Sequence, residues 1–164
     1  MNAITTMNDA IAHAPTAEHI GDADLPWVSS HRMDGVEIKV VTAKVKEGIW
    51  IVRNRFAPGV ELQPHKHTGQ VHAFTLSGAW GYRESEYLNT AGSFLYEPAG
   101  SIHTLYVPES NTEVTDIWFA IWGANLNMDA AGDIESVTDA ESILDFYRRA
   151  CAKIGVENPP VLTD

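Results

Sequence analysis

Two histidines stand two residues apart in the segment 59–78, which begins and ends with glycine. His65 and His67 follow Pro64, and in a β-strand residues i and i+2 project from the same face. The spacing therefore predicts two imidazoles on one face of a strand. Two imidazoles so placed form half of a metal site.

A second segment, 92–103, offers a further ligand. It predicts a strand, a turn at Pro98-Ala99-Gly100, and His103 at the start of the next strand. Three imidazoles suit zinc, copper, iron or nickel, whereas magnesium and calcium prefer oxygen ligands. His65, His67 and His103 are the predicted metal ligands.

Together the two segments resemble the two motifs of the cupin family. The matching residues are Gly59, five residues, His65-x-His67 and Gly78, then Gly92, five residues, Pro98-x-Gly100, two residues and His103. Two positions depart from the motifs, because Val71 stands where a glutamate is expected and Val107 where an asparagine is expected. The resemblance implies a small jelly-roll barrel.

Glu84 is the carboxylate that could replace the one missing at position 71. Trp80, Tyr82 and Glu84 alternate on one face of the strand predicted after Gly78, and that face is expected to look into the barrel. Glu84 would then serve as a fourth ligand or a general base, and the alternative is a solvated charge at a strand end. His72 is predicted to face away from the metal.

The substrate-binding residues are predicted from the same alternation. Gln63 shares the inward face with His65, while Trp80 and Tyr82, with Phe74 or Phe94, would wall an aromatic ring. Glu97, directly before the Pro98 turn, could orient a histidine ligand.

Apolar residues recur every second position along much of the chain. Strands are predicted from Val36, where a change of phase at Val41 indicates a bulge or two short strands, and then at 49–56, 71–77, 79–83, 93–96, 103–107 and 113–122. Near the end, Thr138 and Glu141 are spaced as a capping box before an apolar helical stripe that runs to Ile154. The predicted fold is all-β, a single cupin jelly-roll barrel with a C-terminal α-helix.

Length, composition and charge limit the number of domains and the kinds of binding partner. The 164 residues are 45% hydrophobic, enough for one domain, here a flexible arm at 1–24 and a cupin domain at 25–164. The formal charge of −11 and the absence of a basic run exclude nucleic acid and anionic membranes, so a small molecule is the expected ligand. Cys151 is the only cysteine, and with no long apolar run and no secretory signal, the expected compartment is the cytoplasm.

Further segments resemble the 2,4'-dihydroxyacetophenone dioxygenase family, which is similar to the cupin domain of anti-sigma sensors of the ChrR type. They are Leu25-Pro26-Trp27-Val28, Trp80-Gly81-Tyr82-Arg83-Glu84, Glu97-Pro98-Ala99-Gly100 and His103-Thr104-Leu105. The resemblance implies a homodimer or homotetramer with one iron(II) per chain, for which zinc, nickel or copper could substitute on purification. It also implies cleavage of the C–C bond of an aromatic 2-hydroxyketone by O2, giving an aromatic carboxylate such as 4-hydroxybenzoate and formate. The alternatives are a metal-binding sensor without catalysis, a diketone-cleaving dioxygenase and a metal-dependent isomerase.

Overall fold

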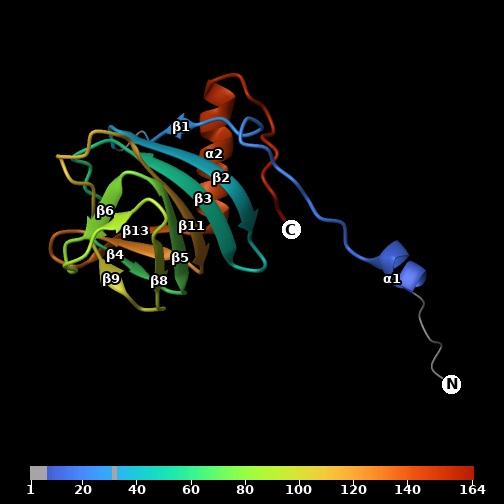
Figure 1. The fold of residues 1–164 in the computed structure, drawn as a ribbon, viewed down its shortest axis with the longest axis horizontal. Coiled ribbons are helices and arrows are strands. Elements are labelled where there is room, and N and C mark those ends of the chain that lie inside the picture. The colour runs from blue at the N-terminus through green and yellow to red at the C-terminus, as the bar shows by residue number, and fades with distance from the viewer. Residues whose placement is uncertain (1–6, 31–32) are drawn as a thin grey trace.

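Three antiparallel sheets enclose one interior in the computed structural model, which describes residues 7–30 and 33–164. The six-stranded sheet has the order β1 (Val28–Ser29), β2 (Val36–Lys44), β3 (Ile49–Phe56), β11 (Thr115–Trp122), β5 (Val71–Ser77) and β8 (Phe94–Glu97). A three-stranded sheet has the order β10 (Leu105–Tyr106), β6 (Ala79–Tyr82) and β7 (Asn89–Thr90). A four-stranded sheet has the order β13 (Ile134–Thr138), β12 (Asn125–Met128), β4 (His65–His67) and β9 (Ile102–His103). Figure 1 shows the sheets curving around a common interior, which confirms the predicted cupin barrel.

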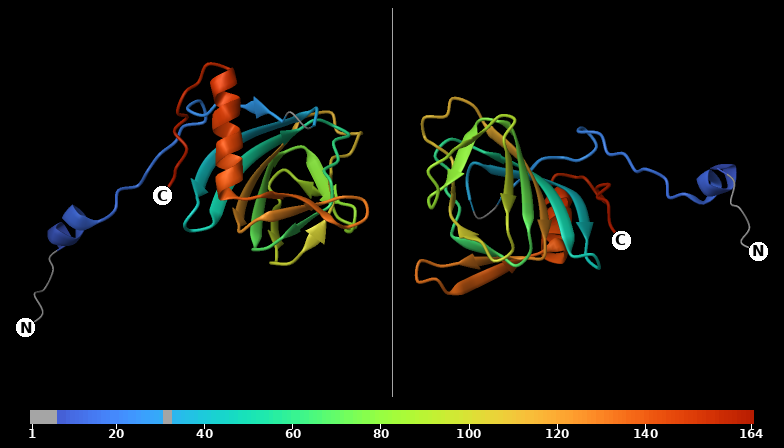
Figure 2. Two further views of the ribbon diagram at one scale, coloured as in Figure 1. Left: turned by 180° about the vertical axis from the view of Figure 1, so that it is seen from behind. Right: turned by 60° about the horizontal axis from the view of Figure 1, so that its bottom comes forward.

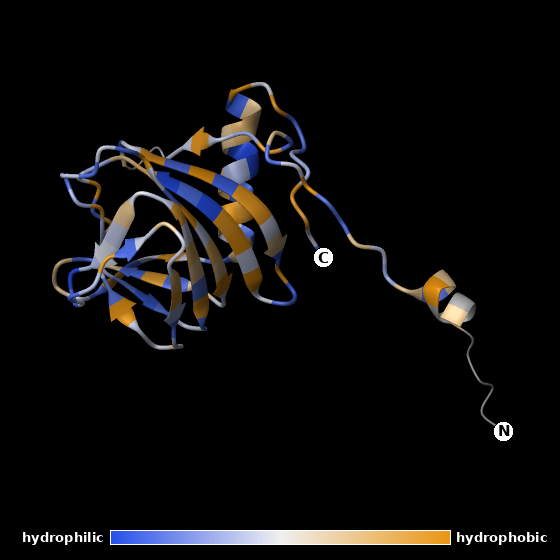
Figure 3. Ribbon diagram, viewed as in Figure 1, coloured by the Kyte–Doolittle hydropathy of each residue, from blue (hydrophilic) through white to orange (hydrophobic). Residues whose placement is uncertain are grey.

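The inward-facing side chains of the six-stranded sheet form the hydrophobic core. Val40, Val52 and Ile117 are buried there, and apolar and polar residues alternate along the first part of β2, whereas β3 and β11 contain apolar runs (Figure 3). The register of β2 against β3 shifts between Val40 and Thr42, so the predicted bulge at Val41 is confirmed. A bulge restores the inward phase of a strand that would otherwise turn its apolar residues outward.

The C-terminal helix α2 (Ala140–Lys153) packs against β1 and β2. It buries Ile143, Leu144 and Tyr147, and the Tyr147 hydroxyl donates a hydrogen bond of 2.6 Å to the Pro26 carbonyl. Cys151 is a buried free thiol in this helix, where it serves packing. The helix therefore covers one side of the barrel, as Figure 2 shows.

The predicted capping box of Thr138 and Glu141 is wrong by one residue. Asp139 is the N-cap, because its Oδ1 accepts from the Ser142 amide at 2.9 Å and the Ser142 hydroxyl accepts from the Asp139 amide at 2.8 Å. Thr138 is the last residue of β13, two residues before the helix begins, and its hydroxyl accepts a hydrogen bond from the Asn127 amide instead.

The arm leads away from the barrel (Figures 1 and 2). Residues 1–6 lie outside the described residues. The segment from Met7 begins with a short helix, α1 (Met7–His13), which the sequence did not indicate, and then runs without regular structure toward the buried Leu25. The division at residue 24 stays a prediction. No helix in the described part of the chain has the length and apolar character needed to cross a membrane.

Candidate metal centre

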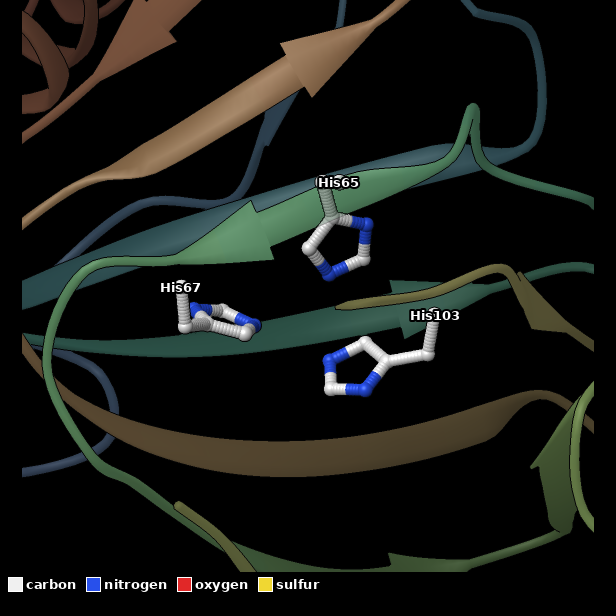
Figure 4. Close-up of side chains that lie close together, drawn as sticks. All are labelled: His65, His67 and His103. Carbon is white, nitrogen blue, oxygen red and sulfur yellow. The ribbon is translucent and has the colours of Figure 1, made fainter. Parts of the chain in front are cut away.

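His65, His67 and His103 come together because β4 pairs with β9. His65 lies opposite His103 in that ladder, and His67 follows two residues later on the same face of β4. All three side chains are buried, and their ligand nitrogens lie within 4.8 Å of one another. Figure 4 shows the three rings converging on one space. Three convergent imidazoles could hold a metal ion.

Backbone contact and burial fix the state of His65. Its Nδ1 lies 3.2 Å from the Gln63 carbonyl oxygen, and donation by Nδ1–H leaves the lone pair of Nε2 for a metal. Burial, with the positive charge of a protonated His67 as a second cause, lowers the pKa of His65 to about 4. His65 is therefore neutral at neutral pH, as a metal ligand must be.

Glu97 brings a carboxylate to the histidines from the end of β8. The side chain is buried, and its Oε2 lies 3.0 Å from Nε2 of His67 and 3.0 Å from Nε2 of His103. The other oxygen, Oε1, accepts a hydrogen bond from the Tyr82 hydroxyl. Burial alone would raise the pKa of Glu97. The neighbouring imidazoles of His103 and His67 and the Tyr82 hydroxyl stabilise its charged form more strongly, so the pKa is lowered to about 2. Glu97 is therefore an anion beside the histidines.

The donor atoms fit a metal ion. Glu97 Oε2 and His103 Nε2 are buried, and neither makes a hydrogen bond to any described residue, although they lie close together. Oε2 of Glu97 lies 3.0 Å from Nε2 of His67 and 3.0 Å from Nε2 of His103, so the carboxylate stands beside the same space as the histidine nitrogens. Three imidazoles and one carboxylate form a set that suits iron or zinc. The sequence assigned Glu97 only an orienting role, and its position as a potential fourth donor was missed.

Tyr82 and Trp80 have different places, although both belong to β6. The Tyr82 ring stacks on His103, with centroids 3.9 Å apart and planes inclined by 10°, and it lines the cavity described below. Trp80 is fully buried, donates from Nε1 to the Thr75 hydroxyl at 2.8 Å, and packs edge-on against Tyr82 and Phe119. Trp80 is thus a core residue outside the cavity wall, and its predicted substrate contact is wrong.

Glu84 does not share the inward face with Trp80 and Tyr82. Strand β6 ends at Tyr82, and the chain turns there, so Glu84 is exposed and accepts hydrogen bonds from the Thr104 amide at 2.9 Å and the Thr104 hydroxyl at 3.0 Å. Burial would raise the pKa of Glu84, but the Thr104 contacts lower it. The carboxylate that meets the histidines is Glu97, and a catalytic role for Glu84 stays a prediction.

The outer face of the six-stranded sheet holds the residues that alternate with the inward ones. His72 faces away from the metal centre, as predicted, among the rings of Phe94, Tyr96 and Trp122. Phe74 and Phe94 lie on this same face and are 46% and 61% exposed. They cannot wall a ligand inside the barrel, so that prediction is wrong.

A cavity of about 550 Å³ opens beside the metal centre. His65, His67 and Tyr82 line one part of it, and Gln63 also lines it, while its role in substrate binding stays a prediction. The Gln63 amide donates to the Met128 carbonyl at 3.1 Å and to Glu135 at 3.3 Å, which ties it to the β12–β13 hairpin. A volume of this size accommodates a small organic molecule.

Comparison with known proteins shows which family and which solved structures the chain is similar to. Residues 16–119 match the family described as ChrR Cupin-like domain. A protein of unknown function with a cupin-like fold from Ralstonia eutropha is 30% identical over 93% of this chain and 94% of that chain, with a TM-score of 0.85. An RmlC-like cupin protein from the same organism is 25% identical over 91% of this chain and 95% of that chain, with a TM-score of 0.85.

An acetylacetone dioxygenase from Acinetobacter johnsonii shares the fold at 15% identity, covering 84% of this chain and 93% of that chain, with a TM-score of 0.72. Comparison with curated protein sequences found no match.

Proposed function

Because the chain belongs to the ChrR cupin-like family, we propose that its buried histidine centre serves an iron(II)-dependent dioxygenase that cleaves an aromatic 2-hydroxyketone. The substrate class comes from the resemblance to 2,4'-dihydroxyacetophenone dioxygenases. The observation that carries the proposal is the cavity of about 550 Å³, which has two of the three ligand histidines in its wall. A site that only held a structural ion would need no such space.

The overall reaction balances with O2 as the only oxidant. The bond between the carbonyl and carbinol carbons breaks, and one oxygen atom of O2 enters each product. With 2,4'-dihydroxyacetophenone the products are 4-hydroxybenzoic acid and formic acid, and the four electrons lost by the two carbons reduce O2. Iron(II), when bound, would supply positions where the ketone oxygens and O2 can meet.

The chain's own residues prepare the site for this chemistry. Neutral His65 presents its Nε2 because the Gln63 carbonyl holds the other nitrogen. The Glu97 carboxylate offsets positive charge, and its hydrogen bond from Tyr82 keeps it in place. Trp50, Val52, Phe119 and Ile121 give the cavity an apolar wall that excludes water from the substrate.

A diketone-cleaving dioxygenase is the second candidate, favoured by the fold shared with the acetylacetone dioxygenase. A sensor that binds metal without catalysis is the third. Oxygen uptake by the iron-loaded protein separates them, with 2,4'-dihydroxyacetophenone and acetylacetone as substrates. We expect one O2 consumed per hydroxyketone and one label from ¹⁸O2 in each product. Uptake with acetylacetone alone would support the second candidate, and uptake with neither, in a protein that retains iron, would support a sensor.

A further inference from the structure

The cavity has two chemically different walls, and strand register explains the difference. In the four-stranded sheet, Asn125 of β12 lies opposite His67 of β4 on one side and opposite Thr138 of β13 on the other. Directly opposed residues share a face of a sheet, and all three line the cavity. A polar row therefore leads away from the metal centre across β12 to β13.

A second polar row runs beside the first. Asn127 lies opposite His65 and opposite Ser136, and these residues also line the cavity. The facing wall is mostly apolar and comes from β2, β3, β11 and α2, with Ile38, Trp50, Phe119 and Ile143 among its residues and Asn54, Ser142 and Arg149 as its polar members. A ligand in the cavity meets hydrogen-bonding groups on one side and mostly apolar side chains on the other.

The two asparagines differ in their partners. The Asn127 amide donates to the Ser136 hydroxyl at 3.2 Å and to the Thr138 hydroxyl at 3.1 Å, so the hairpin holds it. The Asn125 Oδ1 is buried and makes no hydrogen bond to any described residue. Leaving a buried acceptor unpaired is unfavourable, so pairing of this amide with a bound ligand toward which it turns would be favourable.

We infer that Asn125 determines specificity by binding a hydroxyl group at the end of the substrate remote from the metal. Neighbouring strands lie about 4.8 Å apart, so β12 and β13 lie about 5 and 10 Å from the strand that carries His65 and His67. Asn125 is one strand away from His67, so a substrate that holds its carbonyl at the metal centre can extend its aromatic ring along this wall toward Asn125. Acetylacetone has no remote hydroxyl group. The inference rests on the proposed function for its substrate class.

Binding of two unreactive probes tests Asn125 without turnover. 4'-Hydroxyacetophenone and acetophenone differ only in the remote hydroxyl, and Trp50 in the cavity wall offers a fluorescence signal. With zinc-loaded protein we expect the hydroxylated probe to bind about tenfold more tightly, as one hydrogen bond of about 1.4 kcal/mol gives. Asn125→Leu should abolish this preference, and Asn125→Val, which suits a strand, repeats the test if the first variant unfolds.

Asn54 supplies the matched control. It is an asparagine of β3 that lines the same cavity in the facing wall, and its amide bonds to the Glu37 carbonyl at 3.4 Å. Asn54→Leu should keep the preference for the hydroxylated probe. The inference is overturned if wild-type protein does not discriminate between the probes, if Asn125→Leu and Asn125→Val still discriminate, or if Asn54→Leu loses the preference instead. Discrimination by a protein that consumes no O2 would support the role of Asn125 while rejecting the dioxygenase.

Discussion

Glu97 lies directly across the β5–β8 ladder from Val71. Position 71 is where the cupin motif expects a glutamate, and opposed residues of an antiparallel pair share one face, with Cβ atoms about 5 Å apart. The carboxylate missing from one strand is therefore supplied by its neighbour. This pairing explains how a buried three-histidine centre gains a carboxylate although its first motif has none.

Replacement of Glu97 by glutamine should weaken metal binding. Glu97→Gln keeps the shape of the side chain but removes the charge beside His67 and His103, so we expect iron affinity to fall about 10–100-fold. The matched variant is Glu84→Gln, whose carboxylate bonds to Thr104 at the surface and should leave affinity unchanged. Competition with a chelator measures both. If Glu84→Gln instead cuts turnover about 100-fold with iron bound, Glu84 is the general base that the sequence indicated.

Moving the carboxylate from position 97 to position 71, across the β5–β8 ladder, should restore part of the metal affinity that Glu97→Val loses. Glu97→Val removes the anion, and adding Val71→Glu returns one to the same face from the opposite strand. The double variant is expected to hold more iron than Glu97→Val at equal protein concentration, measured by elemental analysis. A folded double variant with no more metal than the single one would show that the two positions are not equivalent.

Histidine substitutions should distinguish the metal ligands from the histidine on the outer face of the sheet. Alanine at His65, His67 or His103 removes one of three convergent ligands and should empty the site. His72→Ala changes a histidine on the other face of the sheet and should retain full metal content. Elemental analysis of the four purified variants decides between them. Loss of metal in His72→Ala with retention in His103→Ala would reverse the ligand assignment.

The strands that bury one face were predicted well. The sequence placed strands at 49–56 and 71–77, and β3 and β5 have these bounds. In both strands the buried residues recur at every second position, with Asn54 of β3 as the exception, because one face meets the core. The helix was found for the same reason, although its cap was placed one residue early.

The β12–β13 hairpin was missed because its pattern is inverted. Asn125 and Asn127 face the interior, where they line a cavity, whereas the apolar Ile134 is exposed. An alternation of apolar and polar residues predicts the wrong face in such a strand. Glu97 was undervalued for a related reason, since its partner Val71 comes from a distant strand and only the sheet register brings them together.

The observed helix cap should contribute measurably to stability. Asp139→Ala removes the acceptor of the Ser142 amide and should lower the free energy of unfolding by about 1 kcal/mol. Glu141→Ala, at the residue that the sequence had placed in the capping box, should change it little. Urea denaturation of both variants measures the difference. A larger loss in Glu141→Ala would restore the capping box that begins at Thr138.

Lowering the pH from 6.5 to about 4 should destabilise the metal-free protein because of His65. Its folded-state pKa is lowered from 6.5 to about 4, so between these values the unfolded chain binds a proton that the folded chain does not. The contribution of His65 to stability is therefore complete above pH 6.5 and declines as the pH falls to 4, by at most about 3 kcal/mol. Urea denaturation of the chelator-treated protein at several pH values should show this decline. His65→Gln should flatten it, whereas His72→Gln should not, and an unchanged slope in His65→Gln would assign the effect to other groups.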